Sequence, residues 1–233
     1  MIVAANLKTN LTRKETESYV NHLEKYMQDS QTTSEVLVFP AMSSLNAHFG
    51  KVTIGAQNAY ATKNGAFTGE IGLNHLDEFG IKTLLIGHSE RRHILGEKQE
   101  ELVKKFNFYK NLGFTIVYCV GEPLEKREAG KEEMMAYISS QYEGIDTEYE
   151  NLIIAYEPVW AIGTGLTPTL EDIQEIHKEL KEKSPAPLLY GGSVKVANAK
   201  EVLAVANVDG VLVGSAALNV GDFCEMIQFT ENL

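Results

Sequence analysis

The sequence has few cysteines, no long apolar run and fewer basic than acidic residues. Its two cysteines, Cys119 and Cys224, show no C-x-x-C spacing, so neither a disulfide framework nor a zinc site is expected. No apolar run reaches the roughly 18 residues of a membrane span, and no basic segment precedes an apolar one at the N-terminus. We therefore expect a soluble, cytoplasmic protein without a membrane partner.

The excess of acidic side chains limits the partners that the protein can attract. With 32 acidic and 21 basic residues, the formal net charge is −11. This charge argues against nucleic acid or an anionic membrane surface as the main partner. An anionic small molecule would need a locally positive pocket.

Eight short apolar runs, rich in β-branched residues, repeat along the chain. They share its 233 residues at about 29 each, near the length of a strand-loop-helix unit. No G-x-G-x-x-G motif follows the first run, so an open dinucleotide-binding sheet is disfavoured. The runs predict strands at Ile2–Ala5, Val36–Phe39, Val52–Gly55, Thr83–Ile86, Thr115–Val120, Leu152–Tyr156, Leu188–Tyr190 and Gly210–Val213.

Amphipathic stretches lie between these runs. Gly113 gives one of them a stop signal, and Thr169 with Asp172 gives another a start signal. Strands that are apolar on both faces and alternate with helices favour a parallel sheet closed on itself. We predict an α/β fold, a single (β/α)8 TIM barrel, with residues 1–233 as one domain. The clearest helices are predicted at Thr12–Met27, Lys98–Leu112 and Leu170–Lys183.

Polar residues and glycines follow several predicted strands, where barrels of this kind build their active sites. Taken singly, Lys8 also fits a surface lysine and His88 a structural histidine. Cys119 is expected to be a small buried apolar residue, and Arg91 with Arg92 a salt-bridging scaffold. The loops after the last two strands carry glycines where barrels commonly bind phosphate. The positions are Asn6, Lys8, Gln57, Asn58, His88, Cys119, Glu157, Gly191, Gly192, Ser193, Gly214 and Ser215.

The segment Ala155–Gly165 says most about chemistry. A predicted strand runs into Glu157, and Pro158 stops it. A short apolar stretch with a Gly-Thr-Gly tip follows. A carboxylate at a strand end beneath such a loop indicates a general base under a mobile lid. A surface turn with an incidental acid fits the local features equally well.

Taken together, the motifs resemble the triosephosphate isomerase family from end to end. The resemblance implies interconversion of glyceraldehyde 3-phosphate and dihydroxyacetone phosphate, a step of glycolysis and gluconeogenesis. It implies no metal and no organic cofactor. It is carried, in this order, by Asn6-x-Lys8, Gly87–Arg92, Cys119-Val-Gly-Glu-Pro, Ala155–Gly165, Tyr190-Gly-Gly-Ser193 and Gly210–Ser215.

The resemblance also implies a role for each matching residue. Glu157 matches the base that moves a proton between two substrate carbons, and His88 matches the electrophile that polarises the carbonyl. Lys8 and Asn6 match groups that hold the substrate and stabilise the enediolate. A helix beginning near Ser89 would place its positive end beside His88 and favour the neutral imidazole. The phosphate contacts are matched by Gly163, Ser193, Gly214 and Ser215.

The chain departs from the common family pattern in its first and last loops. Leu7 and Thr9 stand where Trp and Met are usual, and Ser215 replaces the second glycine of a Gly-Gly pair. The loop Asn58–Glu70, which contains Phe67 and Thr68, resembles the loop by which family members dock into a second subunit. We therefore expect a homodimer, although an ordinary flexible loop is the alternative.

Two other functions stay open on the sequence. One is another phosphate-binding barrel enzyme, such as a phosphosugar epimerase or a ring-forming synthase of amino-acid biosynthesis. It would not need Lys8, His88 and Glu157 together. The other is a non-catalytic barrel that binds or scaffolds, which would be expected to lack at least one of these three residues.

Overall fold

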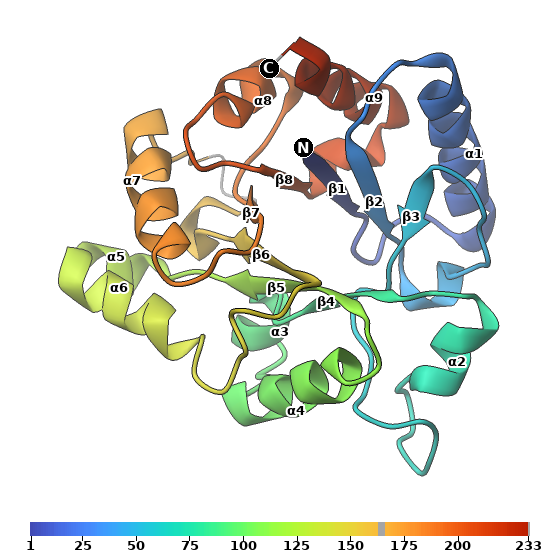
Figure 1. The fold of residues 1–233 in the computed structure, drawn as a ribbon, viewed down its shortest axis with the longest axis horizontal. Helices are drawn as coiled ribbons and strands as arrows, with labels where there is room; N and C mark the ends of the chain where they lie inside the picture. Colours follow the sequence, from blue (N-terminus) through green and yellow to red (C-terminus); the bar gives the residue numbers. More distant parts are fainter. Residues whose placement is uncertain (163–165, 233) are drawn as a thin grey trace.

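The computed structural model describes residues 1–162 and 166–232 of the chain. Parallel strands occupy the middle of the molecule, and helices surround them (Figure 1). Each of the eight apolar runs forms a strand within one residue of its predicted bounds. The strands are β1 (Ile2–Asn6), β2 (Glu35–Phe39), β3 (Val52–Ile54), β4 (Thr83–Ile86), β5 (Thr115–Val120), β6 (Leu152–Tyr156), β7 (Leu188–Tyr190) and β8 (Gly210–Val213).

Helices connect most strands and cover their outer faces. None of the described helices is both long and apolar enough to cross a membrane. The α-helices are α1 (Arg13–Asp29), α2 (Leu73–Glu78), α3 (Ser89–His93), α4 (Gln99–Lys110), α5 (Leu124–Glu128), α6 (Lys131–Ser140), α7 (Leu170–Lys181), α8 (Val196–Leu203) and α9 (Val220–Phe229). Short 3-10 helices are η1 (Met42–Ser44), η2 (Val159–Ala161), η3 (Ser215–Leu218) and η4 (Thr230–Asn232).

A capping side chain marks the start of one predicted helix, and a glycine marks the end of another. Thr169 caps α7 by accepting the backbone N–H of Asp172, whose carboxylate accepts the N–H of Thr169 in return. The chain leaves α4 at Gly113, whose φ of 73° is one that other residues rarely adopt. Both signals were predicted from the sequence, and the structure confirms them.

Hydrogen bonding between the strands closes the sheet into the predicted barrel. The strands pair in the order β3-β2-β1-β8-β7-β6-β5-β4. A single bridge between Ala56 and Leu84 joins the two remaining edges, β3 and β4. In it, the N–H of Ala56 donates to Thr83 O and the N–H of Leu85 donates to Ala56 O, each at 2.9 Å. The seam between β3 and β4 therefore has fewer paired residues than the other strand pairings.

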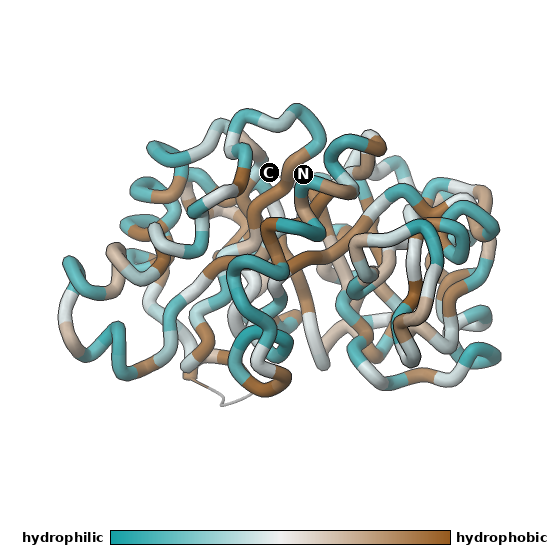
Figure 2. Tube along the Cα trace, turned by 90° about the horizontal axis from the view of Figure 1, so that it is seen from below, coloured by the Kyte–Doolittle hydropathy of each residue, from teal (hydrophilic) through white to brown (hydrophobic). Residues whose placement is uncertain are grey.

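Alternate residues of each strand point into the barrel. The outward residues pack against the helices in a larger core, and Figure 2 shows apolar segments in the middle of the molecule. Continued beyond β6 by one step, the alternation directs Glu157 into the mouth of the barrel. The inward apolar residues are Ile2, Ala4, Leu37, Phe39, Leu85, Val117, Cys119, Ile153, Ala155, Leu189 and Leu212.

Phe39 is the largest of these inward side chains, and it is fully buried. Its ring lies over Gly55, where an added Cβ would come within 2.3 Å of Phe39 Cε1. Glycine at position 55 thus leaves the space that the ring fills. We expect the barrel interior to depend strongly on this contact.

Replacing Phe39 by alanine should leave a cavity that the closed barrel cannot collapse to fill. We expect Phe39→Ala to lower the free energy of unfolding by about 3–5 kcal/mol, measured by urea denaturation. The matched control is Phe49→Ala, because the Phe49 side chain is 89% exposed. That control should change stability by no more than about 0.5 kcal/mol. Equal losses in the two variants would contradict this description of the core.

Candidate active site

A cavity of about 410 Å³ opens at the carboxyl ends of the strands. It brings together, from distant parts of the chain, the described residues to which the family resemblance gave a catalytic or substrate-binding role. Of the other candidate positions, Gln57, Asn58 and Cys119 do not line it. Gly163, a predicted phosphate contact in the predicted lid, lies outside the described residues. The cavity is lined by Asn6, Lys8, His88, Glu157, Ile162, Gly191, Gly192, Ser193, Val194, Lys195, Leu212, Gly214 and Ser215.

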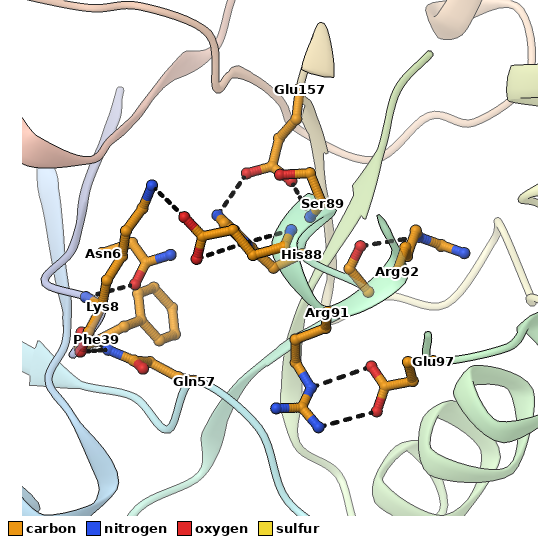
Figure 3. A network of polar contacts seen from close by, with 12 residues as sticks. Asn6, Lys8, Phe39, Gln57, His88, Ser89, Arg91, Arg92, Glu97 and Glu157 are labelled. Atoms are coloured by element: carbon orange, nitrogen blue, oxygen red, sulfur yellow. Dashed lines mark hydrogen bonds and ion pairs between the residues drawn. The ribbon is translucent and has the colours of Figure 1, made fainter. Parts of the chain in front are cut away.

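Glu157 and His88 form a hydrogen-bonded pair within this cavity (Figure 3). Both side chains are buried, and His88 Nε2 lies 3.0 Å from Glu157 Oε1. The backbone N–H of Ser89 donates to the second carboxylate oxygen, Oε2, at 2.9 Å. Both oxygens of Glu157 therefore have a partner, which offsets the cost of burying the carboxylate.

The backbone of Glu157 is fixed as firmly as its side chain. Its N–H donates to Val120 O at 2.7 Å. The next residue of that neighbouring segment, Gly121, approaches so closely that an added Cβ would lie 1.8 Å from Glu157 O. The close approach explains why the Cys-Val-Gly-Glu-Pro motif holds glycine at position 121.

Opposing effects set the pKa of Glu157. Burial raises it, because a desolvated carboxylate is less stable than the neutral acid. The His88 ring, the Ser89 N–H and the charge of Lys8 together outweigh burial and hold the pKa below its ordinary value. Glu157 is therefore ionised at neutral pH and can accept a proton.

The environment of His88 differs from the sequence-based expectation. The ring caps α3, and its Nδ1 accepts the N–H of Glu90 at 3.3 Å, so in the neutral ring the proton sits on Nε2. Burial lowers the pKa of His88, but the Glu157 carboxylate, with Glu90, raises it above its ordinary value. The expected influence of the helix N-terminus is therefore outweighed, because α3 has only five residues and a carboxylate lies in contact.

Lys8 lies opposite this pair, at the end of β1. Its φ of +52° is strained for a residue with a side chain. Two hydrogen bonds hold the strained backbone: Lys8 N–H donates to Asn6 Oδ1 at 3.1 Å, and Gln57 Nε2 donates to Lys8 O at 2.8 Å. Asn6 and Gln57 thus fix the position of Lys8, and Gln57 had no assigned role in the sequence analysis.

The ammonium of Lys8 is paired with an acid that the sequence analysis did not single out. Lys8 Nζ lies 2.7 Å from Glu90 Oε1. An added Cβ at Gly214 would lie 3.6 Å from the same Nζ, so the ammonium also borders the loop after β8. Glu90 lies inside the Gly87–Arg92 motif, and its position next to His88 and Ser89 was the available signal.

Arg91 forms the predicted salt bridge, whereas Arg92 is held by hydrogen bonds to backbone oxygens. Arg91 pairs with Glu97 through Nε at 3.2 Å, and Arg92 donates from Nε to Gly87 O at 2.8 Å and from Nη2 to Cys119 O at 3.1 Å. Cys119 is fully buried in the barrel interior, and burial raises the pKa of its thiol well above the ordinary value. The thiol is therefore protonated and apolar in character, as the sequence suggested.

The arrangement suits proton transfer on a small anion. A buried carboxylate, a ring N–H beside it and an ammonium converge on a cavity that the loops after β7 and β8 also line. Within the described residues, no three His, Cys, Asp or Glu side chains are grouped so that they could hold a metal ion.

Comparison with known proteins gives the same family along the whole chain. The sequence model of the triosephosphate isomerase family matches residues 1–230. A triosephosphate isomerase of Sulfurimonas denitrificans is 67% identical over 233 residues, which cover 100% of this chain and 97% of the relative. One of Nitratiruptor is 52% identical over 233 residues, with 100% of each chain covered. One of Helicobacter pylori is 48% identical over 231 residues, 98% of each. The chain belongs to the triosephosphate isomerase family.

Proposed function

We propose that the protein interconverts glyceraldehyde 3-phosphate and dihydroxyacetone phosphate, with Glu157 as the base and His88 as the electrophile. The observation that carries this assignment is the buried contact of 3.0 Å between His88 Nε2 and Glu157 Oε1. The two groups lie side by side in a cavity that the substrate must enter. The family membership of the whole chain supports the same reaction.

In the proposed reaction a proton moves between adjacent carbons of the substrate. The Glu157 carboxylate removes a proton from the carbon next to the carbonyl, and the electron pair moves onto the carbonyl oxygen to form an enediolate. His88 donates a hydrogen bond from Nε2 to that oxygen. It passes its Nε2 proton to this oxygen and takes the hydroxyl proton from the neighbouring oxygen, which exchanges the positions of the hydroxyl and the carbonyl. Protonated Glu157 then returns its proton to the other carbon. Substrate must first displace the Glu157–His88 hydrogen bond.

Charge and backbone groups around the pair have complementary roles in this proposal. The ammonium of Lys8, held by Asn6 and Gln57, stabilises the negative charge of the enediolate. Ser193, Gly214 and Ser215 border the part of the cavity that would receive the phosphate. Because the protein carries a net charge of −11, this local arrangement must supply the attraction for an anionic substrate.

One assay separates this function from the two alternatives. The purified protein is incubated with glyceraldehyde 3-phosphate, and the ketone product is followed by its coupled reduction. We expect conversion without added metal or organic cofactor. A phosphosugar epimerase, a ring-forming synthase or a non-catalytic barrel would give no dihydroxyacetone phosphate.

We also propose that one catalytic domain acts in the cytoplasm as a homodimer that docks through the loop Asn58–Glu70. Phe67 in this loop is 42% exposed although it is aromatic. Its ring packs against that of Tyr60, tilted by 36° and with 4.3 Å between centroids, so the two rings form an apolar surface on the loop. Ile94 and Leu95, after α3, are also exposed, and a second subunit would cover such side chains.

The first test shortens the proposed base. Glu157→Asp retracts the carboxylate by about 1 Å, which should lower kcat/KM on the order of 100-fold because the base no longer reaches the substrate carbon. KM should change much less, since the phosphate contacts are untouched. Steady-state kinetics of the folded variant measure both values. Retention of kcat/KM within about threefold would show that Glu157 is not the base.

A second test concerns the pKa of His88. In Glu157→Gln, the largest influence that raises this pKa is removed while burial still lowers it, so the pKa should fall. NMR titration of the ring measures the change, with His88→Gln used to assign the resonance. His177 is the internal control, because burial lowers its pKa to about 4 without any contribution from Glu157. An unchanged or higher His88 pKa in Glu157→Gln would contradict the pairing.

A third test concerns assembly. Phe67→Arg should place an unpaired charge in the proposed interface, a cost of several kcal/mol, and should dissociate the dimer with loss of most activity. Leu112→Arg is the control, because Leu112 is 38% exposed but follows α4 at the other end of the barrel. Sedimentation and activity are measured together. A wild-type protein that is monomeric at micromolar concentration and fully active would rule out the proposal.

A further inference from the structure

A second buried carboxylate, Glu122, is hydrogen-bonded to residues on both sides of the proposed base in the sequence. It is fully buried at the end of β5, and its Oε1 accepts hydrogen bonds from Trp160 Nε1 at 2.9 Å and from Tyr156 OH at 3.2 Å. Both donors flank Glu157 in the sequence. The backbone makes the same connection, because Val159 N–H donates to Glu122 O at 3.0 Å. Glu122 thus binds the chain both before and after Glu157.

Arg127 is the cation associated with this buried acid. Its Nη1 lies 3.7 Å from Glu122 Oε1, and its Cζ lies 4.6 Å from the centroid of the Trp160 ring. A guanidinium in this position neutralises the carboxylate and also stacks on the indole face. The Arg127 side chain is only 23% exposed, so water screens these interactions incompletely.

The same guanidinium reaches the start of α7. Arg127 Nη2 donates to Asp172 Oδ1 at 2.8 Å. The other oxygen of Asp172, Oδ2, accepts the N–H and the hydroxyl of Thr169 in the capping box of α7. Arg127 therefore connects the two described segments that flank residues 163–165: η2 on one side and the N-terminus of α7 on the other.

We propose that Arg127 is a positioning residue for the proposed reaction: by binding Glu122, Trp160 and Asp172 at once, it fixes the chain that follows Glu157. It acts through these partners and does not line the cavity. The inference rests on the proposed function, because the group that it positions is the proposed base. A guanidinium is needed, since its planar fork provides several donors and a stacking face, whereas a lysine ammonium is a single charged point.

The alternative role is a simple ion pair that joins neighbouring helices. The chain offers a matched control for it, because Lys131 at the start of α6 also pairs with α7. Lys131 Nζ lies 2.6 Å from Glu175 Oε1 and 2.9 Å from Glu179 Oε1. Its side chain is 52% exposed. Lys131→Met removes two ion pairs to α7 but leaves the contacts of Glu122 and Trp160 intact.

The experiment compares Arg127→Met with Lys131→Met in the full chain. Because a shift of about 1 Å in a reacting group can cost on the order of 100-fold, we expect kcat of Arg127→Met to fall at least tenfold. KM should stay within about twofold, since the cavity lining is unchanged. Lys131→Met should retain both values. Equal kcat values in wild type, Arg127→Met and Lys131→Met would overturn the proposal.

Trp160 provides a readout that does not depend on catalysis. It is the only tryptophan of the chain, so its fluorescence reports this position alone. Without the guanidinium over its ring, the indole should gain solvent and its emission should shift to longer wavelength in Arg127→Met. The spectrum of Lys131→Met should match that of wild type. An unshifted Arg127→Met spectrum would contradict the positioning role, whether or not the wild type is active. Absence of isomerase activity in the wild type would instead reject the proposed function.

A pH titration of the same emission gives a further distinction. Burial raises the pKa of Glu122, and the bonds from Trp160 and Tyr156, together with Arg127, partly offset this. Removal of Arg127 should therefore move the acid transition of Trp160 emission to higher pH. Arg127→Lys keeps the charge and serves if Arg127→Met does not fold. Arg127→Lys should restore the wild-type pH midpoint of Trp160 emission but not the full kcat. Full recovery of kcat in Arg127→Lys would show that the planar guanidinium is not needed.

Discussion

The active site depends on one constraint, the alternation of inward and outward side chains along parallel strands. On β1 and β6 this alternation ends the apolar part of the barrel interior at Ala4 and Ala155. The next inward positions are Asn6 and Glu157, where the packed interior meets the cavity. A carboxylate at this boundary is desolvated and would be costly to ionise without partners. The Ser89 N–H and the His88 ring supply these partners. The fold that buries the carboxylate therefore also brings the groups that keep it ionised.

Strand positions and helix signals were predictable because they are local. The bounds of β5 and β6, and the capping box of Thr169 and Asp172, agree with the sequence because each needs only a few neighbouring residues. Positions of the site residues followed from the strand ends. Their partners did not, because Glu90 contacts Lys8 from 82 positions away in the sequence and Gln57 from 49 positions away.

The same limit explains the one electrostatic expectation that was wrong. From the sequence, a helix beginning at Ser89 was expected to lower the pKa of His88. The structure places Glu157 in contact with the ring, and a full charge at 3.0 Å outweighs the partial charge of a five-residue helix. The contact joins positions 69 residues apart, so only the folded barrel discloses it. Local motifs give the identity of a titrating group, whereas tertiary contacts set its pKa.

The single bridge between β3 and β4 has a consequence for how the native barrel opens. Local unfolding proceeds where few backbone hydrogen bonds and few packed contacts must break. At this seam the backbone bonds are those of Ala56, assisted nearby by the 2.7 Å bond from Lys105 Nζ to Asn58 Oδ1. Within the described residues, the barrel is therefore one curved sheet whose two edge strands, β3 and β4, are joined only by this bridge. In native-state hydrogen exchange, the amides of Ala56 and Leu85 would open without the global unfolding that releases the amides of β6.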